Sequence, residues 1–508
     1  MFRNVLTIGG WTFASRILGF LRDMMIAAAL GAGPLADAFF IALRLPNLFR
    51  RLFGEGAFNA AFVPAFTGLL TLEGPKRARD LAERMSTLMT LWLLLLVGLG
   101  MVFMPQVMRV LTPGLADDPY RFELVVELSR ITFPYLLFIC LTALVSGVLN
   151  AVDRFAMAAG APLLFNLFAI VSLLALTPYV ATPAHALAWG TMASGVAQLA
   201  LVVVACHRAG LGFRLVSWPR VTPETKQVVR TMLPGLLGAS ITQLSLAIDI
   251  FIASLLPAGA IAMLNYADRV AQLPLGVVGA AIGTALLPLL SRQLRAGRKL
   301  AAHRSMNRAV ELSLALTLPA AAALMVLAEP IVLALFQRGA MTTEAARGTA
   351  AALIAYAAGL PAFVLVKAFA PGFFARGDTA TPVKIGIVVV VVNLSISLSL
   401  LHLLAHVGIA LATATAAWVN TGLLCLILAR RGQWLADRRL RRNLWRLLLA
   451  AAVMAALLAC VSALLPPATG LWRWLELGLL VAVGLVAYFG MTQLLGALRL
   501  TDVLRRRA

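Results

Sequence analysis

IGIVVVVVNLSISLSLLHLL is the run of residues 385–404, and it contains no Asp, Glu, Lys or Arg. A helix of this length spans about 30 Å, which is the thickness of the hydrocarbon core of a bilayer. Similar apolar blocks recur along the 508 residues, for example at 91–103 and 447–465. Hydrophobic residues make up 61% of the chain and charged residues 13%, against about 25% charged residues in soluble domains. The sequence therefore predicts an all-α polytopic membrane protein.

The apolar blocks predict fourteen transmembrane helices. We place them near residues 5–30, 35–70, 84–105, 122–150, 160–178, 184–206, 228–256, 260–291, 305–328, 346–374, 382–403, 407–429, 443–465 and 471–497. Thirty Lys and Arg residues then lie in loops and ends on one side of the membrane, and five on the other. Because cytoplasmic loops are enriched in Lys and Arg, both termini are predicted to be cytoplasmic.

The net charge of +22 does not indicate a nucleic-acid partner. The basic residues form short clusters between apolar segments, which is typical of cytoplasmic loops and would suit anionic membrane lipids. The four cysteines are widely spaced in apolar stretches, so neither a disulfide framework nor a metal framework is expected. The first segment carries Arg16, Arg22 and Asp23 and is not expected to be a cleaved signal peptide.

Two regions of the sequence resemble each other. GAGPLAD (31–37) is followed by Arg44-Leu-Pro, and PAGA (257–260) is followed by Ala267-Asp-Arg and Gln272-Leu-Pro. Internal repeats are common in secondary transporters, which bind substrate between the repeated halves. We therefore expect two pseudo-symmetric six-helix lobes, residues 1–207 and 208–430, followed by two further helices and a basic cytoplasmic tail in 431–508.

Eight basic residues remain inside the predicted helices or at their edges: Arg16, Arg22, Arg44, Arg50, Arg51, Arg130, Arg269 and Lys367. A charge at the centre of the bilayer costs about 3 kcal/mol or more, so such residues face a cavity, a partner or a substrate. Five of the eight lie in the first two helices. Some of these, Arg44 and Arg51 in particular, could instead reach the lipid headgroups.

The cluster in the first two helices is rich in arginine, whose planar fork of donors suits a phosphate. Asp23, Asp37 and Glu55 lie nearby in the sequence and could hold these arginines while the site is empty. The pattern predicts a cavity that binds a phosphate or diphosphate. Asp249 is a lone carboxylate between isoleucines, which is either an ion or proton site or a structural residue.

The chain lacks the motif G-x-x-x-x-G-K-[ST], zinc-binding motifs and loops with enough polar groups for catalysis. We therefore expect a transporter without a bound cofactor, not an enzyme. An ion gradient or the membrane potential would drive it. An integral-membrane enzyme acting on polyprenyl diphosphates would need clustered carboxylates or metal ligands, and a drug or cation antiporter would need an acidic cavity.

Longer motifs resemble the MurJ/MviN family. They are SRILGFLRD (15–23), ADAFFIALRLPNLFRR (36–51), GEGAFNAAFVPAF (54–66), LAIDI (246–250), YADR (266–269) and APGFFARGDTATPVK (370–384). The resemblance implies the multidrug/oligosaccharidyl-lipid/polysaccharide exporter superfamily. It also implies a flippase of the bacterial inner membrane that moves lipid II, the undecaprenyl-diphosphate-linked precursor of peptidoglycan, to the periplasmic leaflet for cell-wall biogenesis and cell shape. A flippase for another polyprenyl-diphosphate-linked glycan is the alternative.

The resemblance also assigns roles to residues. It implies a substrate cavity formed by Arg16, Arg22, Arg50 and Arg269 with the acidic residues Asp23, Asp37 and Glu55, and a groove for the lipid tail in the last two helices. A sodium site of some members would fall on Asp249, Asn393 and Thr413, but Ser397 replaces an acidic ligand. Either Na⁺ or H⁺ is therefore a candidate coupling ion. Other cell-wall synthesis proteins are candidate partners.

Overall fold

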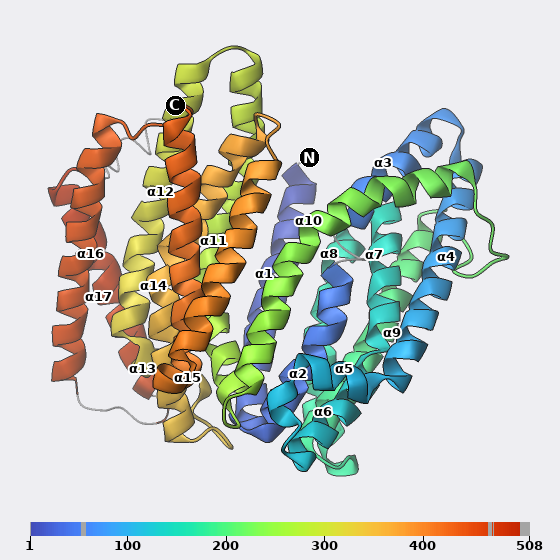
Figure 1. The fold of residues 1–508 in the computed structure, drawn as a ribbon, viewed down its shortest axis with the longest axis horizontal. Helices are drawn as coiled ribbons and strands as arrows, with labels where there is room; N and C mark the ends of the chain where they lie inside the picture. The colour runs from blue at the N-terminus through green and yellow to red at the C-terminus, as the bar shows by residue number, and fades with distance from the viewer. Residues whose placement is uncertain (1, 52–56, 466–469, 471, 498–508) are drawn as a thin grey trace. The chain divides into compact units, whose positions relative to one another are not determined.

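The structure is a computed structural model that describes residues 2–51, 57–465, 470 and 472–497. These residues are helical apart from turns and short connections, and the chain divides into two compact units (Figure 1). Unit 1 comprises Met1–Ala262 with Arg338–Met341, and unit 2 comprises Met263–Gln337 with Thr342–Ala508.

Unit 1 contains ten long or medium helices among its described residues. They are α1 (Phe2–Leu30), α2 (Pro34–Phe49), α3 (Ala57–Leu72), α4 (Pro75–Val102), α5 (Met104–Leu111), α6 (Pro119–Thr132), α7 (Tyr135–Ala151), α8 (Phe155–Ala175), α9 (Pro183–Arg208) and α10 (Pro223–Ser254). Its core is aromatic and aliphatic, and it includes Phe58, Phe62 and Phe66 on one face of α3. Proline at the first position begins several of these helices, where its missing N–H costs nothing.

Unit 2 contains the remaining helices. They are α11 (Ala260–Arg295, whose first residues belong to unit 1), α12 (Lys299–Val326), α13 (Ala328–Phe336), α14 (Thr343–Phe374), α15 (Ala380–Arg430), α16 (Arg438–Leu464) and α17 (Trp472–Leu494). Its core joins residues of α12, α14 and α15 to Leu447 of α16 and Tyr488 of α17. Figure 1 shows α16 and α17 as neighbouring antiparallel helices, with α12 beside α16.

Each predicted membrane helix has a helical counterpart, although several ends shift, such as the start of α4 at Pro75 instead of residue 84. In three places the match is not one predicted helix to one observed helix. The expected helix 35–70 corresponds to α2 and α3, with residues 52–56 outside the described residues, and the expected helix 122–150 is interrupted at Pro134 between α6 and α7. The expected helices 382–403 and 407–429 form the 51-residue α15 with non-helical backbone at Ala405 (φ 46°). A straight helix of that length would measure about 77 Å, more than twice the hydrocarbon core, so the break divides it into two membrane-length segments.

Nine helical segments of the described chain are long and apolar enough to cross a membrane. Their outer faces expose large apolar side chains, such as Leu91, Trp92, Leu94 and Leu95 of α4. A face of this kind suits lipid and would be unfavourable in water. The structure thus confirms an all-helical protein with many apolar helices, while the number of fourteen spans and the cytoplasmic termini stay predictions.

The boundary between the units differs from the expected lobe boundary near residue 207. The helix α10 packs against α3, α4 and α5 and therefore belongs to unit 1, and Figure 1 shows it running alongside α3. The division into lobes at 207 and 430 concerns movement during transport, which contacts within one structure do not test. It stays a prediction.

Candidate functional site

Arg22 is a buried arginine in the apolar helix α1, with 7% of its surface exposed. Its Nε and Nη2 donate hydrogen bonds of 3.0 and 2.6 Å to Oδ1 of the adjacent Asp23. Its Nη1 donates a 2.9 Å bond to Oδ1 of Asn166 in α8. The guanidinium carbon lies 5.0 Å from the ring centre of Phe165, close enough for a cation–π interaction. Four favourable contacts therefore offset the cost of removing this charge from water.

Asn166 orients the site by bonding to two residues of α1 that lie two turns apart on one face. Its Nδ2 donates a 2.9 Å bond to the carbonyl oxygen of Ser15, while its Oδ1 accepts from Arg22. The two helices are in contact here, since a Cβ on Gly19 would lie 3.4 Å from Asn166, an ordinary van der Waals distance. The sequence analysis did not select Asn166 or Phe165 as site residues. The feature of the sequence that could have identified them is an asparagine, preceded by an aromatic residue, within an otherwise apolar helix.

Asp37 is also buried, with 2% of its surface exposed, and it stabilises the beginning of α11. Its Oδ2 accepts a 2.6 Å bond from the N–H of Gly259, and its Oδ1 accepts a 2.8 Å bond from the N–H of Ala262. Nη2 of Arg121 lies 3.8 Å from Oδ2. The first N–H groups of a helix lack partners within the helix, so a carboxylate placed here satisfies two of them.

A second contact lies near the end of α1, where Ala340 N–H donates a 2.8 Å bond to the carbonyl oxygen of Ala28. Glycines make this approach feasible on both sides. A Cβ on Gly31 would lie 2.5 Å from the oxygen of Ala340, and one on Gly339 would lie 2.2 Å from the oxygen of Ala28. We call the contact of residues 338–341 with the end of α1 the clasp. It explains why these four residues belong to unit 1 although their neighbours belong to unit 2.

The other predicted cavity residues occupy different environments. Arg16 is exposed on α1, and Arg50 is half-buried directly after α2. Arg269 is exposed on the part of α11 that belongs to unit 2, and Glu55 lies outside the described residues. Within unit 1 the structure therefore places Arg22 and Asp23 in contact, and it places Asp37 at the start of α11. The role of all seven residues in substrate binding stays a prediction.

The predicted ion-coupling residues are distributed over both units. Asp249 is half-buried on α10 of unit 1, whereas Asn393 and Thr413 lie on α15 of unit 2. Asn393 and Ser397, one turn apart, are buried, and the Thr413 hydroxyl donates to the carbonyl oxygen of Ile409. The described part of the chain holds no group of three or more His, Cys, Asp or Glu residues that could bind a metal. An ion site at these positions stays a prediction.

Comparison with known proteins identifies the family of the chain. The sequence profile of the family described as "Lipid II flippase MurJ" matches residues 26–477. The chain belongs to the lipid II flippase MurJ family. A protein of Rhizobium meliloti (strain 1021) called probable lipid II flippase MurJ is 44% identical, over 98% of this chain and 95% of its own length. A Burkholderia cenocepacia protein called lipid II flippase MurJ is 35% identical, over 90% and 89%.

Solved structures share the fold of this MurJ-family chain. One titled "Lipid II flippase MurJ, inward closed conformation" gives a TM-score of 0.78 at 23% identity, covering 96% of this chain and 98% of that one. An inward-facing multidrug resistance MATE family transporter of the MOP superfamily gives 0.66 at 15% identity, covering 82% and 96%. At these identities the likeness establishes the fold alone. With its apolar helices, the MurJ-family chain is a multi-pass protein of the bacterial inner membrane.

Proposed function

We propose that this protein moves lipid II from the cytoplasmic to the periplasmic leaflet, and that Arg22 binds the diphosphate of the substrate. The names of the relatives and the match over nearly the whole chain support lipid II as the substrate. The observation that carries the proposed site is the buried guanidinium of Arg22 in an apolar helix. A buried charge of this kind in a membrane helix marks a substrate or ion pathway by default.

The hydrogen bonds of Arg22 indicate how a phosphate would bind. A guanidinium has five N–H donors, and three of them are used by Asp23 and Asn166. One N–H on each terminal nitrogen remains, which can contact a phosphate oxygen while Asn166 keeps the side chain oriented. A doubly charged diphosphate would also compete with Asp23 for Nε and Nη2.

Arg16, Arg50 and Arg269 are the proposed further partners of the diphosphate. Lipid II carries two adjacent phosphates, and several arginines would share their charge better than one. In this proposal, the bound anion relieves repulsion between the arginines and favours closure of the cytoplasmic entrance, and release to the periplasmic side restores the repulsion. Alternating access of this kind is driven by the membrane potential or by Na⁺ or H⁺, with Asp249, Asn393 and Thr413 as the proposed coupling residues.

Anionic lipids are proposed partners of the first turns of α16. Arg438, Arg441 and Arg442 are exposed there, and Trp445, one turn further, has 74% of its surface exposed. Arginine and tryptophan at the end of an apolar helix are typical of the headgroup region of a membrane. Contacts with other cell-wall synthesis proteins stay a prediction.

The test is exposure of lipid II on the outer leaflet of cells depleted of their own flippase. This chain is expressed there, and an externally added enzyme or probe measures accessible lipid II. We expect the wild type and the control Arg77→Ala, which breaks an exposed ion pair with Glu73, to restore exposure. Arg22→Ala at the same membrane level should not restore it. Full activity of Arg22→Ala would exclude the proposed site, and failure of the wild type would favour another polyprenyl-linked glycan.

A further inference from the structure

We propose that Glu311 is a positioning residue for transport, which fixes the hairpin of α16 and α17 against α12; this inference rests on the proposed function. Four charged side chains are buried among the described residues: Arg22, Asp23, Asp37 and Glu311. The first three belong to the site in unit 1. Glu311 lies in unit 2, in the first half of α12, and neither the sequence motifs nor the proposed transport site accounts for it.

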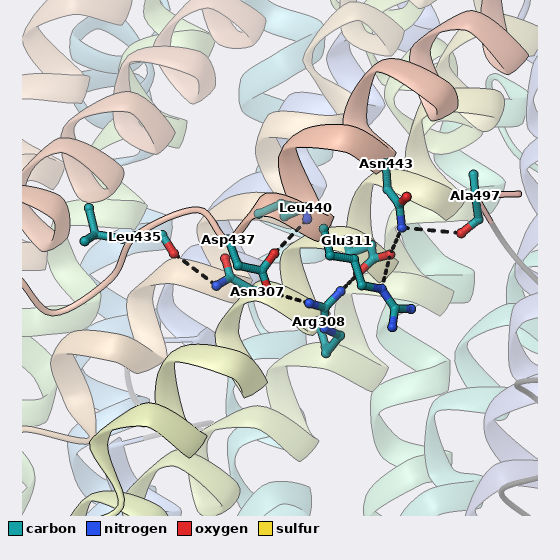
Figure 2. Close-up of polar contacts among 9 residues, drawn as sticks. Asn307, Arg308, Glu311, Leu435, Asp437, Leu440, Asn443 and Ala497 are labelled. Carbon is teal, nitrogen blue, oxygen red and sulfur yellow. Dashed lines mark hydrogen bonds and ion pairs between the residues drawn. The ribbon is translucent and has the colours of Figure 1, made fainter. Parts of the chain in front are cut away.

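Glu311 is the centre of a polar junction between α12 and α16 (Figure 2). It accepts from Arg308 one turn earlier on α12, from Asn443 Nδ2 at 2.5 Å and from Arg439 Nε at 3.4 Å. Arg308 also donates a 2.5 Å bond to Asp437, which caps α16 through the N–H of Leu440 at 2.7 Å. The same carboxylate network therefore fixes the position and the first turn of α16.

The charges of the junction balance. Two arginines, Arg308 and Arg439, face two carboxylates, Glu311 and Asp437. A site built to hold an anionic substrate would carry excess positive charge, whereas a network of balanced charges favours one geometry of the helices that contribute to it. Loss of the Glu311 carboxylate would leave two arginines beside one carboxylate. The junction is therefore suited to holding helices together and not to binding a phosphate.

Further hydrogen bonds extend the junction along the hairpin. Asn307 donates a 3.0 Å bond to the carbonyl oxygen of Leu435, just before α16. The hydroxyl of Tyr488 on α17 donates a 2.7 Å bond to the carbonyl oxygen of Ala315, one turn beyond Glu311. Asn443 also lies 3.5 Å from the carbonyl oxygen of Ala497, beyond the end of α17. Both helices of the hairpin are thus attached to the same part of α12.

The opposite end of the hairpin contacts the segment that leads into the clasp. Arg473, in the first turn of α17, donates a 2.7 Å bond to Oε1 of Gln337. Gln337 is the residue directly before the clasp residues 338–341. A hairpin held by Glu311 at one end therefore places Arg473 against Gln337 at the other. Movement of the hairpin would displace the residue that precedes the clasp, and this connects Glu311 to transport without contact with substrate.

The test compares full-length wild type, Glu311→Ala, Glu311→Gln and the control Glu329→Ala in phosphatidylethanolamine–phosphatidylglycerol vesicles that contain lipid II. Glu329 also pairs with an arginine in unit 2, but its side chain is 49% exposed. Two quantities are measured for each protein: lipid II flipping per folded molecule, and backbone hydrogen exchange of α16 and α17. Hydrogen exchange reports local opening separately from global unfolding.

For Glu311→Ala we expect faster exchange in α16 and α17, unchanged exchange in unit 1 outside the clasp, and flipping reduced by about tenfold. Glu311→Gln keeps an oxygen that can accept from Asn443 and should be intermediate, while Glu329→Ala should match the wild type. Flipping per molecule at the wild-type level in both Glu311 variants would overturn the positioning role, as would unchanged exchange in the hairpin.

Further variants and the wild-type control distinguish the positioning role from misfolding and from failure of the proposed function. If Glu311→Ala does not fold, Glu311→Gln and Asn443→Ala, which removes a single donor of the junction, are judged by the same criteria. If the wild type itself does not move lipid II in these vesicles, the proposed function fails. If the wild type moves lipid II and the Glu311 variants equal it, the positioning role alone fails.

Discussion

Nη1 of Arg22 donates a 2.9 Å hydrogen bond to Oδ1 of Asn166, which lies 144 residues further along the chain. This bond joins α1 to α8, so the orientation of a buried guanidinium on one helix depends in part on an amide from another. Asn166 is a neutral amide. Among these contacts, the positive charge of Arg22 is therefore offset by Asp23 alone. Small changes at position 166 should therefore separate the structural and electrostatic roles of the site.

Asn166→Leu and Asn166→Asp should have different effects. Leucine leaves a donor of Arg22 and the carbonyl oxygen of Ser15 without their partner, so we expect a loss of about 1–3 kcal/mol in the free energy of unfolding and lower flipping. Aspartate keeps an acceptor for Arg22, but it adds a second carboxylate beside Asp23 and gives the site a net negative charge, so we expect lower flipping. Thermal unfolding in detergent and lipid II exposure in cells measure the two effects. Equal flipping in Asn166→Asp and wild type would contradict the electrostatic role.

Asp37→Asn should weaken the attachment of α11. An amide has one acceptor oxygen, so either Gly259 or Ala262 would face an NH₂ group and lose its hydrogen bond. We expect a loss of about 1–3 kcal/mol in the free energy of unfolding and faster hydrogen exchange at residues 259–262. The control is Asp80→Asn, since the Asp80 side chain is 57% exposed and its ion pair should contribute little. An equal loss in both variants would contradict the proposed cap.

Gly339→Ala should open the clasp. Both Gly339 (φ +56°) and Gly377 (φ +77°) have left-handed backbone, which costs an alanine about 1–2 kcal/mol. A Cβ on Gly339 would also lie 2.2 Å from the oxygen of Ala28, whereas no atom lies within 4 Å of a Cβ on Gly377. We therefore expect Gly339→Ala to lower the unfolding temperature clearly more than Gly377→Ala. Equal shifts would show that the clasp does not stabilise the protein.

Asp378 should make stability depend on pH below about 4. In the loop between α14 and α15, the Thr381 hydroxyl and then Arg431 hold the pKa of the Asp378 carboxyl below its ordinary value of 3.8. The contribution of a carboxylate with a lowered pKa is complete above the pKa of the unfolded chain and is lost as the pH falls toward the folded pKa. The difference in unfolding temperature between wild type and Asp378→Asn should therefore be constant near pH 7 and shrink at pH 3. A constant difference down to pH 3 would contradict this assignment.

The sequence predicted the helices well because the bilayer imposes a simple length and composition on each span. The predictions were least accurate where tertiary contacts set the boundary. Pro134 lies at the interruption of one expected helix, and α10 packs with unit 1. The break at Ala405, in contrast, falls between the two helices expected at 382–403 and 407–429. The residues around Pro134 form one apolar span, so hydropathy alone does not mark the interruption there.

Part of the site was also predictable from hydropathy. Arg22, Asp23 and Asp37 are charged residues in apolar surroundings, and that contrast is visible in the sequence. Asn166 and Glu311 were missed because their importance depends on residues 144 and 132 positions away, Arg22 and Asn443, and hydropathy carries no record of such pairs.

By itself, the sequence determined that this is a polytopic membrane protein of the MurJ family with arginines in the apolar segments near its N-terminus. Apolar length and the cost of charge in lipid are local properties, and they can be evaluated one segment at a time. Only the tertiary structure decided that Asp37 caps α11, that Gly31 and Gly339 meet at the clasp, and that Glu311 attaches α16 to α12. Each of these depends on directional hydrogen bonds or close backbone contact between distant segments, which arise only when the helices pack.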